Sequence, residues 1–262
     1  MATVATDVVV VGGGALGSCV AYALARRGVA VTLLDASTPG RATSASAGGL
    51  WPLGESLGLG CGVIFHAAHG GGGAPEPLPR AFMEFLCASN QRFSVLAAEL
   101  CALTGVNIEA ESGTGLLYLL YDEVQEGHAR RILEWLGDGR EVVERWTPDQ
   151  VRARDPLVTR DLLGAIHFPA DNQVNPMLLA EALKRAATAK GAKFVAEARV
   201  HALRVQGDRV VAVESSRGAF ACVAVVNAAA ASPCRRSVRA PARSGCRSPR
   251  GERSARSTRR PR

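Results

Sequence analysis

The feature that most constrains how this chain can fold is a glycine-rich turn between a buried strand and a helix. An apolar run led by one acid, residues 7–11, predicts a parallel strand that is buried on both faces. The turn follows at once, because Gly-Gly-Gly-Ala-Leu-Gly at residues 12–17 matches the pattern G-x-G-x-x-G. Apolar residues then recur every three or four positions up to Gly28, and a second apolar strand, residues 29–34, ends at Asp35. This order of elements predicts an α/β fold that binds a dinucleotide.

The residues of this turn have distinct expected roles. Gly12 allows the tight turn, Gly14 lets the backbone approach a pyrophosphate, and Gly17 lets helix and strand pack closely. The N-terminus of the helix supplies free N–H groups to the phosphates. Asp35 is placed to accept hydrogen bonds from a ribose hydroxyl pair, and its charge would repel a 2′-phosphate, which disfavours NADP. A glycine-rich turn without a ligand is the alternative.

The residues after Asp35 are small and polar. Residues 36–50 include Thr-Ser-Ala-Ser-Ala-Gly-Gly at positions 43–49. Such residues let backbone donors pack against a flat ring system, whereas larger side chains would hold the ring away. A surface linker is the alternative for this composition.

The rest of the chain alternates helical and strand patterns. Helices are predicted at residues 79–104 and 122–136, from Asn175 to Gly191, and after Thr147, which would cap a short helix with Pro148 in its first position. Strands are predicted at residues 108–109, 115–121, 164–168, 193–196, 200–205, 210–215 and 220–226. Phe82, Phe85 and Leu103 fall on the expected inner stripe of the first of these helices.

The positive charge of the chain is concentrated at its C-terminal end. The 262 residues carry a formal net charge of +7. Residues 233–262 contain eleven Arg, no Lys and one acid, a net of +10, so residues 1–232 carry −3. The globular part is therefore mildly acidic, which argues against a specific nucleic-acid partner. Since residues 233–262 also lack apolar periodicity, we expect them to form a disordered, non-globular Arg-rich tail.

Cysteine and histidine usage argues against a disulfide framework and against a metal site. The seven cysteines include no C-x-x-C pair and no spacing typical of zinc ligands. His66 and His69 lie beside a glycine run, without an acid or a cysteine at matching spacing, so we predict no metal. We find no signal-peptide pattern and no apolar stretch of transmembrane length, and we expect a reducing, cytoplasmic location.

Four separated motifs carry a resemblance to a known family. They are residues 12–35, residues 43–49, Asp-Asn-Gln-Val-Asn-Pro at 171–176 and Val-Val-Asn-Ala-Ala at 225–229. In this order and spacing the chain resembles the D-amino-acid oxidase-like FAD-dependent oxidoreductases. That family includes glycine oxidases, sarcosine oxidases, D-amino-acid dehydrogenases and the flavin subunits of hydrogen cyanide synthase. The segment 80–105 looks closest to the glycine oxidase and cyanide synthase branch.

The resemblance implies FAD as the cofactor and indicates which residues would bind it. Residues 41–50 would wrap the pyrophosphate, the ribityl chain and the flavin, the backbone of Val200 would contact the adenine side, and residues 227–230 would pass close to the cofactor. The expected cofactor-binding residues are Gly12, Gly14, Ala15, Leu16, Gly17, Asp35, Ala36, Ser37, Arg41, Thr43, Ser44, Ala47, Gly48, Gly49, Leu50, Val200, Ala228, Ala229 and Ala230.

The reaction that the resemblance implies is oxidation of the carbon–nitrogen bond of an amino acid or a secondary amine, by hydride transfer to the flavin. The expected substrate is a small-molecule amine or amino acid (glycine, a D-amino acid or a sarcosine-like compound), and association with other oxidoreductase subunits is among the expected interactions. No catalytic side chain is assigned, and the electron acceptor, oxygen or a quinone, stays open. Two alternatives also stay open. One is a non-catalytic nucleotide-binding remnant or partner subunit, and the other is an NAD-dependent dehydrogenase, against which residues 43–49 argue.

The chain departs from the family pattern towards its C-terminal end. Ala230 stands where the family usually has a glycine, and residues 233–262 do not match the further strands of the family. We therefore expect a C-terminally truncated chain whose catalytic competence is open. The tail would be a product of out-of-frame translation or, alternatively, a basic tail that contacts nucleic acid.

The expected architecture is a Rossmann-like FAD-binding core, a parallel sheet with helices, interrupted by a second domain. The core would comprise residues 1–59 and 156–232. An incomplete α+β substrate domain would comprise residues 60–155.

Overall fold

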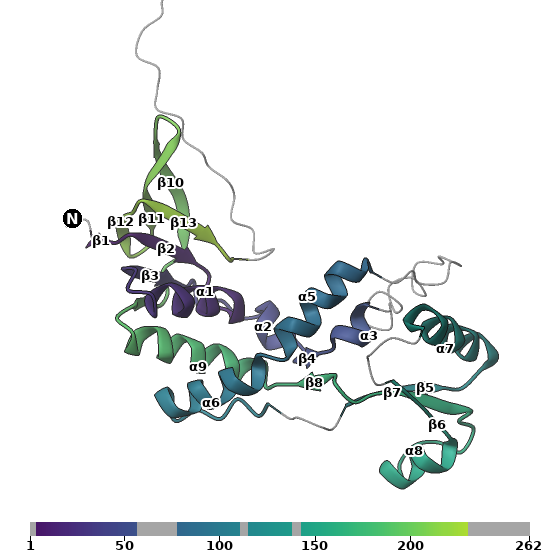
Figure 1. Ribbon diagram of the computed structural model, residues 1–262. Coiled ribbons are helices and arrows are strands. Elements are labelled where there is room, and N and C mark those ends of the chain that lie inside the picture. Colours follow the sequence, from purple (N-terminus) through teal and green to yellow (C-terminus); the bar gives the residue numbers. More distant parts are fainter. Residues whose placement is uncertain (1–3, 57–77, 111–114, 138–142, 230–262) are drawn as a thin grey trace, which may run out of the picture.

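The protein forms two lobes, as its computed structural model shows (Figure 1). The structure describes residues 4–56, 78–110, 115–137 and 143–229. Ala230, His66, His69 and the predicted tail at 233–262 lie outside the described residues. One lobe contains two four-stranded sheets, and the other contains a three-stranded sheet with its helices.

A four-stranded parallel sheet forms the centre of the first lobe. Its order is β13 (Ala224–Asn227), β2 (Val8–Val11), β3 (Val31–Leu34) and β9 (Lys193–Val195). Helices α1 (Ala15–Ala25) and α9 (Pro176–Ala189) pack on one face, in a core that includes the fully buried Ala21, Ala182 and Ala186. These small side chains let the helices lie close together. The predicted α/β fold with a parallel sheet is confirmed.

Both faces of this sheet are covered, which explains its continuous apolar strands. Val10 packs in the core with α1 and α9, whereas Val9 and Val11 pack on the opposite face. A second sheet lies over that face, in the order β1 (Val4–Ala5), β12 (Gly218–Ala221), β11 (Arg209–Ser215) and β10 (Val200–Gln206).

Two of the predicted strands are wrong in detail. Residues 220–226 belong to two strands of different sheets. Strand β12 lies antiparallel to β11 in one sheet, and β13 lies parallel to β2 in the other. Between them the N–H of Val223 donates to the carbonyl oxygen of Asp7 at 3.0 Å, as the chain passes from one sheet to the other. Residues 108 and 109 form no strand, although Ile108 is fully buried and its carbonyl oxygen accepts from the N–H of Asn175 at 2.9 Å.

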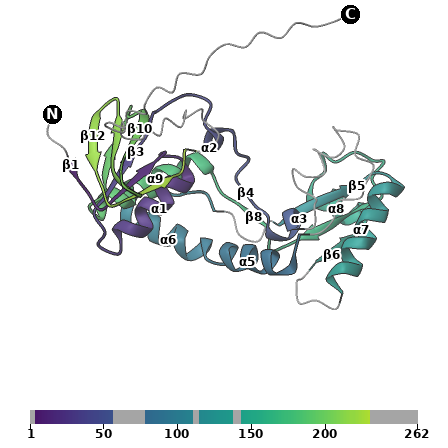
Figure 2. The ribbon, with the colours of Figure 1, turned by 90° about the horizontal axis from the view of Figure 1, so that it is seen from above.

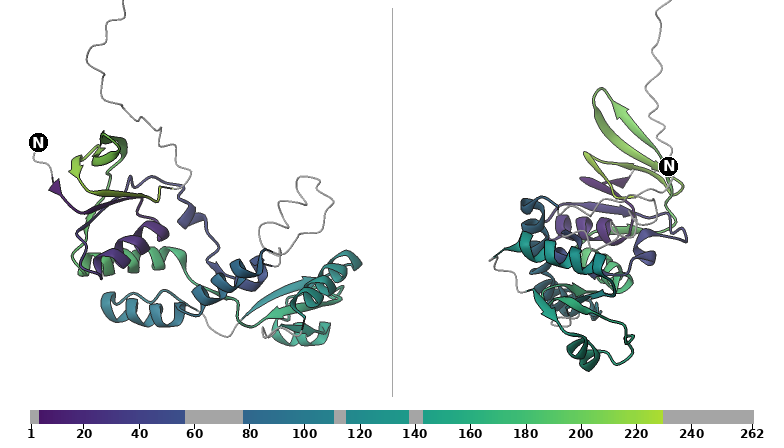
Figure 3. Two further views of the ribbon diagram at one scale, coloured as in Figure 1. Left: turned by 45° about the horizontal axis from the view of Figure 1, so that its top comes forward. Right: turned by 90° about the vertical axis from the view of Figure 1, so that its right-hand side faces the viewer.

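The helix predicted at residues 79–104 is also divided. It forms α5 (Arg80–Asn90) and α6 (Phe93–Thr104), of which α6 packs on the first lobe through the buried Leu100 and α5 runs on towards the second lobe (Figure 3). The expected inner stripe is wrong for Phe82, Phe85 and Leu103, which are 47%, 65% and 38% exposed. A chain that changes direction between two helices presents different faces to the core, so one stripe does not describe both.

The second lobe is built on a three-stranded antiparallel sheet. Its order is β5 (Leu116–Leu120), β7 (Gly164–Phe168) and β6 (Glu144–Trp146). Leu120, Ile166 and Phe168 are fully buried in a core shared with α7 (Glu123–Leu136). Strand β7 falls within the range 156–232 but pairs with β5 and β6, which fall within the range 60–155. The expected division into domains stays a prediction.

Helix α8 (Pro148–Arg154) begins as the sequence predicts. The Oγ1 atom of Thr147 accepts from the N–H of Gln150 at 3.3 Å, and the side chain of Gln150 accepts from the N–H of Thr147 at 2.8 Å. This capping box satisfies two N–H groups that the helix itself leaves without partners.

A short strand pair and a buried carboxylate connect the two lobes. Strand β4 (Gly49–Leu50) pairs with β8 (Asn172–Gln173) and leads into α3 (Pro52–Ser56) (Figure 2). Asp171 is 1% exposed, and its carboxylate accepts from the N–H groups of Leu53 at 3.1 Å and Gly54 at 2.8 Å. Burial raises the pKa of this carboxyl group to about 6, although both hydrogen bonds favour the charged form.

We expect Asp171→Asn to change how the free energy of unfolding depends on pH. Because the pKa of Asp171 is raised in the folded chain, the folded state binds this proton more tightly than the unfolded state does. The contribution of Asp171 to the free energy of unfolding therefore falls as the pH rises from about 4 to about 6, by at most about 3 kcal/mol. Denaturant unfolding at pH values across this window measures the slope, and the part that Asp171 contributes should be missing in Asp171→Asn.

Asp208→Asn is the matched control, because Asp208 is exposed in the turn between β10 and β11. Its pH profile should follow that of the parent chain. If Asp171→Asn kept the parent slope, the proton would not be bound at Asp171.

Candidate functional site

One large cavity lies at the carboxyl ends of β2 and β3, where the glycine-rich turn leads into α1. Its volume is about 980 Å³, at the upper end of the range typical of ligand pockets. Its walls come from residues 11–16, 34–36, 38–43, 46, 48–50, 174, 176, 179, 198–201 and 228–229. The carboxyl ends of parallel strands are the usual place for ligands in open α/β sheets.

The glycine-rich turn lies so close to neighbouring backbone that no side chain would fit. A Cβ atom on Gly17 would lie 1.8 Å from the carbonyl oxygen of Gly12, and a Cβ atom on Gly12 would lie 2.6 Å from the carbonyl oxygen of Ala228. Gly12 also has a φ of +104°, which favours glycine. The turn therefore presents bare backbone to the cavity, which a ligand can approach closely.

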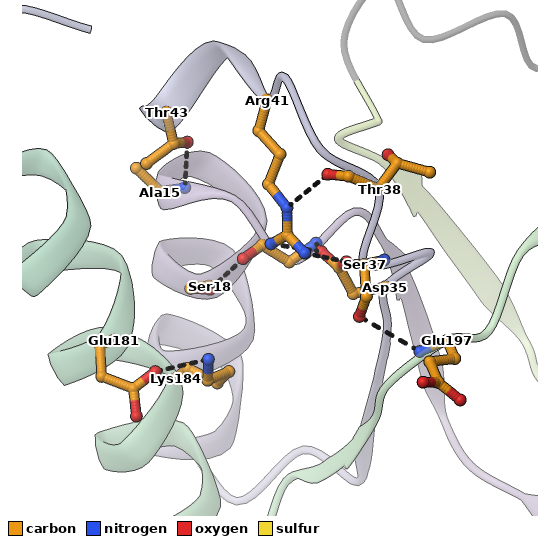
Figure 4. Close-up of polar contacts among 11 residues, drawn as sticks. Ala15, Ser18, Asp35, Ser37, Thr38, Arg41, Thr43, Glu181, Lys184 and Glu197 are labelled. Carbon is orange, nitrogen blue, oxygen red and sulfur yellow. Dashed lines mark hydrogen bonds and ion pairs between the residues drawn. The ribbon is translucent and has the colours of Figure 1, made fainter. Parts of the chain in front are cut away.

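The N-terminus of α1 contributes N–H groups to the cavity. The first hydrogen bond of the helix runs from the N–H of Ser18 to the carbonyl oxygen of Gly14 at 2.9 Å, so the preceding N–H groups have no partner within the helix. Among them, the N–H of Ala15 donates to Thr43 Oγ1 at 3.0 Å (Figure 4). Gly14, Ala15 and Leu16 all line the cavity. Free N–H groups and the helix dipole together favour an anion here.

The carboxylate of Asp35, which is only 6% exposed, is surrounded by donors at the end of β3. Its Oδ2 atom accepts from the N–H of Gly13 and its Oδ1 atom accepts from the N–H of Ser37, both at 2.5 Å. The guanidinium of Arg41 lies against the same carboxylate, with Nη2 3.0 Å from Oδ1 and Nη1 3.4 Å from Oδ2 (Figure 4). These partners offset the desolvation of the buried charge and hold it at the cavity wall.

The segment 41–50 forms part of the wall of the cavity. It contains one helical turn, α2 (Ala42–Ala45), and then Gly48, with a φ of +78°. A Cβ atom on Gly48 would lie 2.0 Å from the carbonyl oxygen of Val174, so the wall packs tightly against the chain just before α9. A second cavity of about 190 Å³ shares Gly49 and Leu50 with the large one.

Most of the predicted cofactor-binding residues lie around the large cavity. Those that line it are Gly12, Gly14, Ala15, Leu16, Asp35, Ala36, Arg41, Thr43, Gly48, Gly49, Leu50, Val200, Ala228 and Ala229. Gly17, Ser37, Ser44 and Ala47 do not line it, and Ala230 lies outside the described residues. Gly17 and Ser37 instead support the site, through close packing and through the bond to Asp35. Whether these residues bind a cofactor stays a prediction.

Sequence reasoning missed several wall residues that come from distant segments. Val174, Pro176 and Leu179 line the cavity from the start of α9, and Arg199 and His201 line it on either side of Val200. The motif at residues 171–176 was a usable signal for the first group. No local pattern marks the second group, because strand pairing alone brings it to the cavity.

Other polar clusters of the described residues lie apart from this cavity. In the second lobe His167 Nδ1 lies 3.1 Å from Glu144 Oε2, to which Trp146 Nε1 also donates at 2.7 Å. The hydrogen bonds from Trp146 and His167 lower the pKa of Glu144. Within the described ranges, no group of three or more His, Cys, Asp and Glu residues could hold a metal ion. No helix in this part of the chain has the length and apolar character needed to cross a membrane.

Comparisons with known proteins identify the family of the chain. A family model described as FAD dependent oxidoreductase matches residues 7–250. The chain is 36% identical to hydrogen cyanide synthase subunit HcnC of Pseudomonas protegens, over 85% of this chain and 57% of that protein. It is 30% identical to glycine oxidase of Bacillus subtilis, over 72% of this chain and 44% of that protein. The chain thus spans about half the length of these relatives.

Solved structures show the same fold. The crystal structure of glycine oxidase from Geobacillus kaustophilus matches with a TM-score of 0.72 and 27% identity. The match covers 86% of this chain and 55% of that chain.

We expect Gly17→Ala to destabilise the first lobe. Its Cβ atom would lie 1.8 Å from backbone, so α1 or the turn must move, and we expect a loss of about 2–4 kcal/mol in the free energy of unfolding. Gly127→Ala in α7 is the control, because no atom lies within 4 Å of the new Cβ. Helix propensity should make that variant up to about 1 kcal/mol more stable. Urea unfolding followed by circular dichroism compares the two, and equal stabilities would contradict the close approach at Gly17.

Proposed function

The chain belongs to the family of FAD-dependent oxidoreductases, and from this premise we propose that it binds FAD in the large cavity and oxidises a carbon–nitrogen bond. FAD is the cofactor of this family. One observation carries the proposal. The glycine-rich turn, the N-terminus of α1 and the carboxylate of Asp35 surround a single cavity at the carboxyl ends of β2 and β3.

The residues present fit the adenosine diphosphate half of this cofactor. The bare backbone of Gly12 and Gly14 and the N–H groups at the start of α1 suit a diphosphate. The carboxylate of Asp35 suits a ribose hydroxyl pair, and Val200 lies on the wall where the base would follow. We propose as cofactor contacts the cavity-lining residues Gly12, Gly14, Ala15, Leu16, Asp35, Ala36, Arg41, Thr43, Gly48, Gly49, Leu50, Val200, Ala228 and Ala229.

The chain's own residues would bind and orient the cofactor and the substrate, and the bound cofactor would supply the acceptor for the hydride. Residues 48–50 also line the cavity and have little side-chain bulk at Gly48 and Gly49, which suits a flat ring. The smaller cavity adjoins this wall and is lined by apolar side chains of Trp51 and Phe93 and by polar groups of Glu55 and Asn90. A small amine would fit beside the ring there. No catalytic side chain is assigned.

An amino acid or a secondary amine is the substrate class that the relatives support. Glycine oxidases of Bacillus subtilis and Geobacillus kaustophilus are named for an amino acid, and HcnC is named as a subunit. We therefore propose a small amine or amino acid as substrate and another oxidoreductase subunit as partner. Cysteine usage without a disulfide pattern supports a cytoplasmic location.

A non-catalytic nucleotide-binding subunit is the second candidate. One observation favours it: HcnC, to which the chain is 36% identical, is itself named as a subunit. This candidate binds FAD as well, so binding and turnover must be measured separately.

We expect the purified chain to bind FAD at least about a hundredfold more tightly than FMN, because FMN lacks the adenosine half for which Asp35 and α1 are placed. Asp35→Asn should weaken FAD binding about tenfold or more, since a carboxylate that accepts hydrogen bonds from two hydroxyl groups is replaced by an amide. Asp161→Asn is the control, because Asp161 is exposed and does not line the cavity. Titration followed by flavin fluorescence gives the dissociation constants, and equal affinity for FAD and FMN would refute this site.

Turnover separates the two candidates. With FAD bound and oxygen excluded, addition of glycine, sarcosine or a D-amino acid should bleach the absorbance of the oxidised flavin if the chain is catalytic. Tight FAD binding without bleaching by any of these substrates would favour the non-catalytic subunit.

A further inference from the structure

Four donor groups already surround the carboxylate of Asp35 where a ribose would bind. An ionised carboxylate offers about four lone-pair sites. Two are filled by the backbone N–H groups of Gly13 and Ser37, and the other two face the two terminal nitrogens of Arg41, at 3.0 and 3.4 Å. A ribose hydroxyl pair would need two sites on the same carboxylate, so one of these partners must leave before it binds.

Arg41 is the partner that can leave. The N–H groups of Gly13 and Ser37 belong to the backbone of the two turns and move only if those turns move. The side chain of Arg41 is 36% exposed, and its guanidinium is carried on a flexible stem. Its Nε atom donates only to the carbonyl oxygen of Thr38, at 3.2 Å (Figure 4). The guanidinium lies on the exposed side of the pair, so it can leave once other donors satisfy the buried carboxylate.

We infer that Arg41 competes with the ribose for Asp35 and passes to the diphosphate when a dinucleotide binds. This inference rests on the proposed FAD site. In the ligand-free chain the guanidinium neutralises the buried carboxylate. In the bound chain the ribose hydroxyls take its place, and the guanidinium forms a forked, charge-assisted contact with the diphosphate.

The diphosphate position lies within reach of Arg41. Thr43 follows two residues later, and its Oγ1 atom already binds the N–H of Ala15 at the N-terminus of α1, where an anion would bind. Two residues of extended chain span at most about 7 Å, and an arginine side chain is of similar length. Arg41 and Ala15 also line the same cavity. The guanidinium can therefore reach the diphosphate without any movement of the chain around Thr43.

This exchange makes the diphosphate a condition for tight binding. A ligand that carries a ribose but no phosphate must displace Arg41 and leave the cation without a new partner. A ligand that carries both groups receives the displaced cation. Arg41 would thus lower the affinity for adenosine and raise the affinity for ADP and FAD, which is a selectivity that neither Asp35 nor the helix N-terminus provides alone.

The test compares adenosine, ADP and FAD on the full chain and on Arg41→Met, which removes the charge and keeps much of the apolar stem. We expect ADP and FAD to bind to the variant at least about tenfold more weakly, and adenosine to bind about fivefold more tightly. Calorimetry gives the affinity for ADP, displacement of FAD gives that for adenosine, and circular dichroism checks that the variant is folded.

Arg185→Met is the matched control. Arg185 also pairs with a carboxylate, that of Glu181 in α9 at 2.8 Å, but it does not line the cavity. All three affinities should be unchanged in that variant. Arg41→Lys, which keeps the charge but loses the fork, should fall between the parent chain and Arg41→Met for ADP.

Adenosine is the ligand that decides the outcome. If Arg41 only held Asp35 in place, adenosine would bind more weakly to Arg41→Met, and if Arg41 only attracted phosphate, adenosine would be unaffected. Either result, or an unchanged affinity for ADP, overturns the inference while leaving the FAD site intact. If the parent chain bound neither ADP nor FAD, the proposed function would fail together with the inference.

Discussion

The approach of α1 to the glycine-rich turn is the contact on which the rest of the site depends. At Gly17 the helix lies so close to the carbonyl oxygen of Gly12 that no side-chain carbon would fit between them. The helix can therefore start directly at the end of β2, with its free N–H groups at the cavity. The same turn brings the N–H of Gly13 within 2.5 Å of Asp35 Oδ2, so one short segment of backbone positions both the anion-binding end of the helix and the carboxylate of the next strand.

Two buried aspartates illustrate how differently this chain places negative charge. Asp35 is paired with a cation, Arg41, and with two backbone N–H groups. Asp171 accepts from two backbone N–H groups as well, but the charged residue that acts on it is Glu55, another acid. Desolvation then prevails and raises its pKa to about 6. The first carboxylate is suited to a site that exchanges partners, and the second is suited to holding α3 against the strand pair between the lobes.

Packing on two sides explains which elements could be predicted. Strands β2 and β3 are buried on both faces, and the helix between them starts at the glycine-rich turn, so apolar runs and the glycine spacing located all three. Residues 220–226 are equally apolar, yet they serve two sheets, and nothing in the run marks where the chain passes between them. Phe82 and Phe85 belong to an apolar pattern of helical spacing, yet α5 turns away from the core on which α6 packs, which leaves both rings exposed.

The sequence by itself determined the parallel α/β core, the glycine-rich turn and the acid at the end of the second strand, because these depend on local spacing and on residues without side chains. It also indicated the family and hence the cofactor. Only the tertiary structure decided that Arg199 and His201 reach the cavity, that Gly48 packs against Val174, and that Arg41 fills the acceptor sites of Asp35. Each of these contacts joins segments whose distance is set by strand pairing or loop closure, and side-chain type carries no information about that distance.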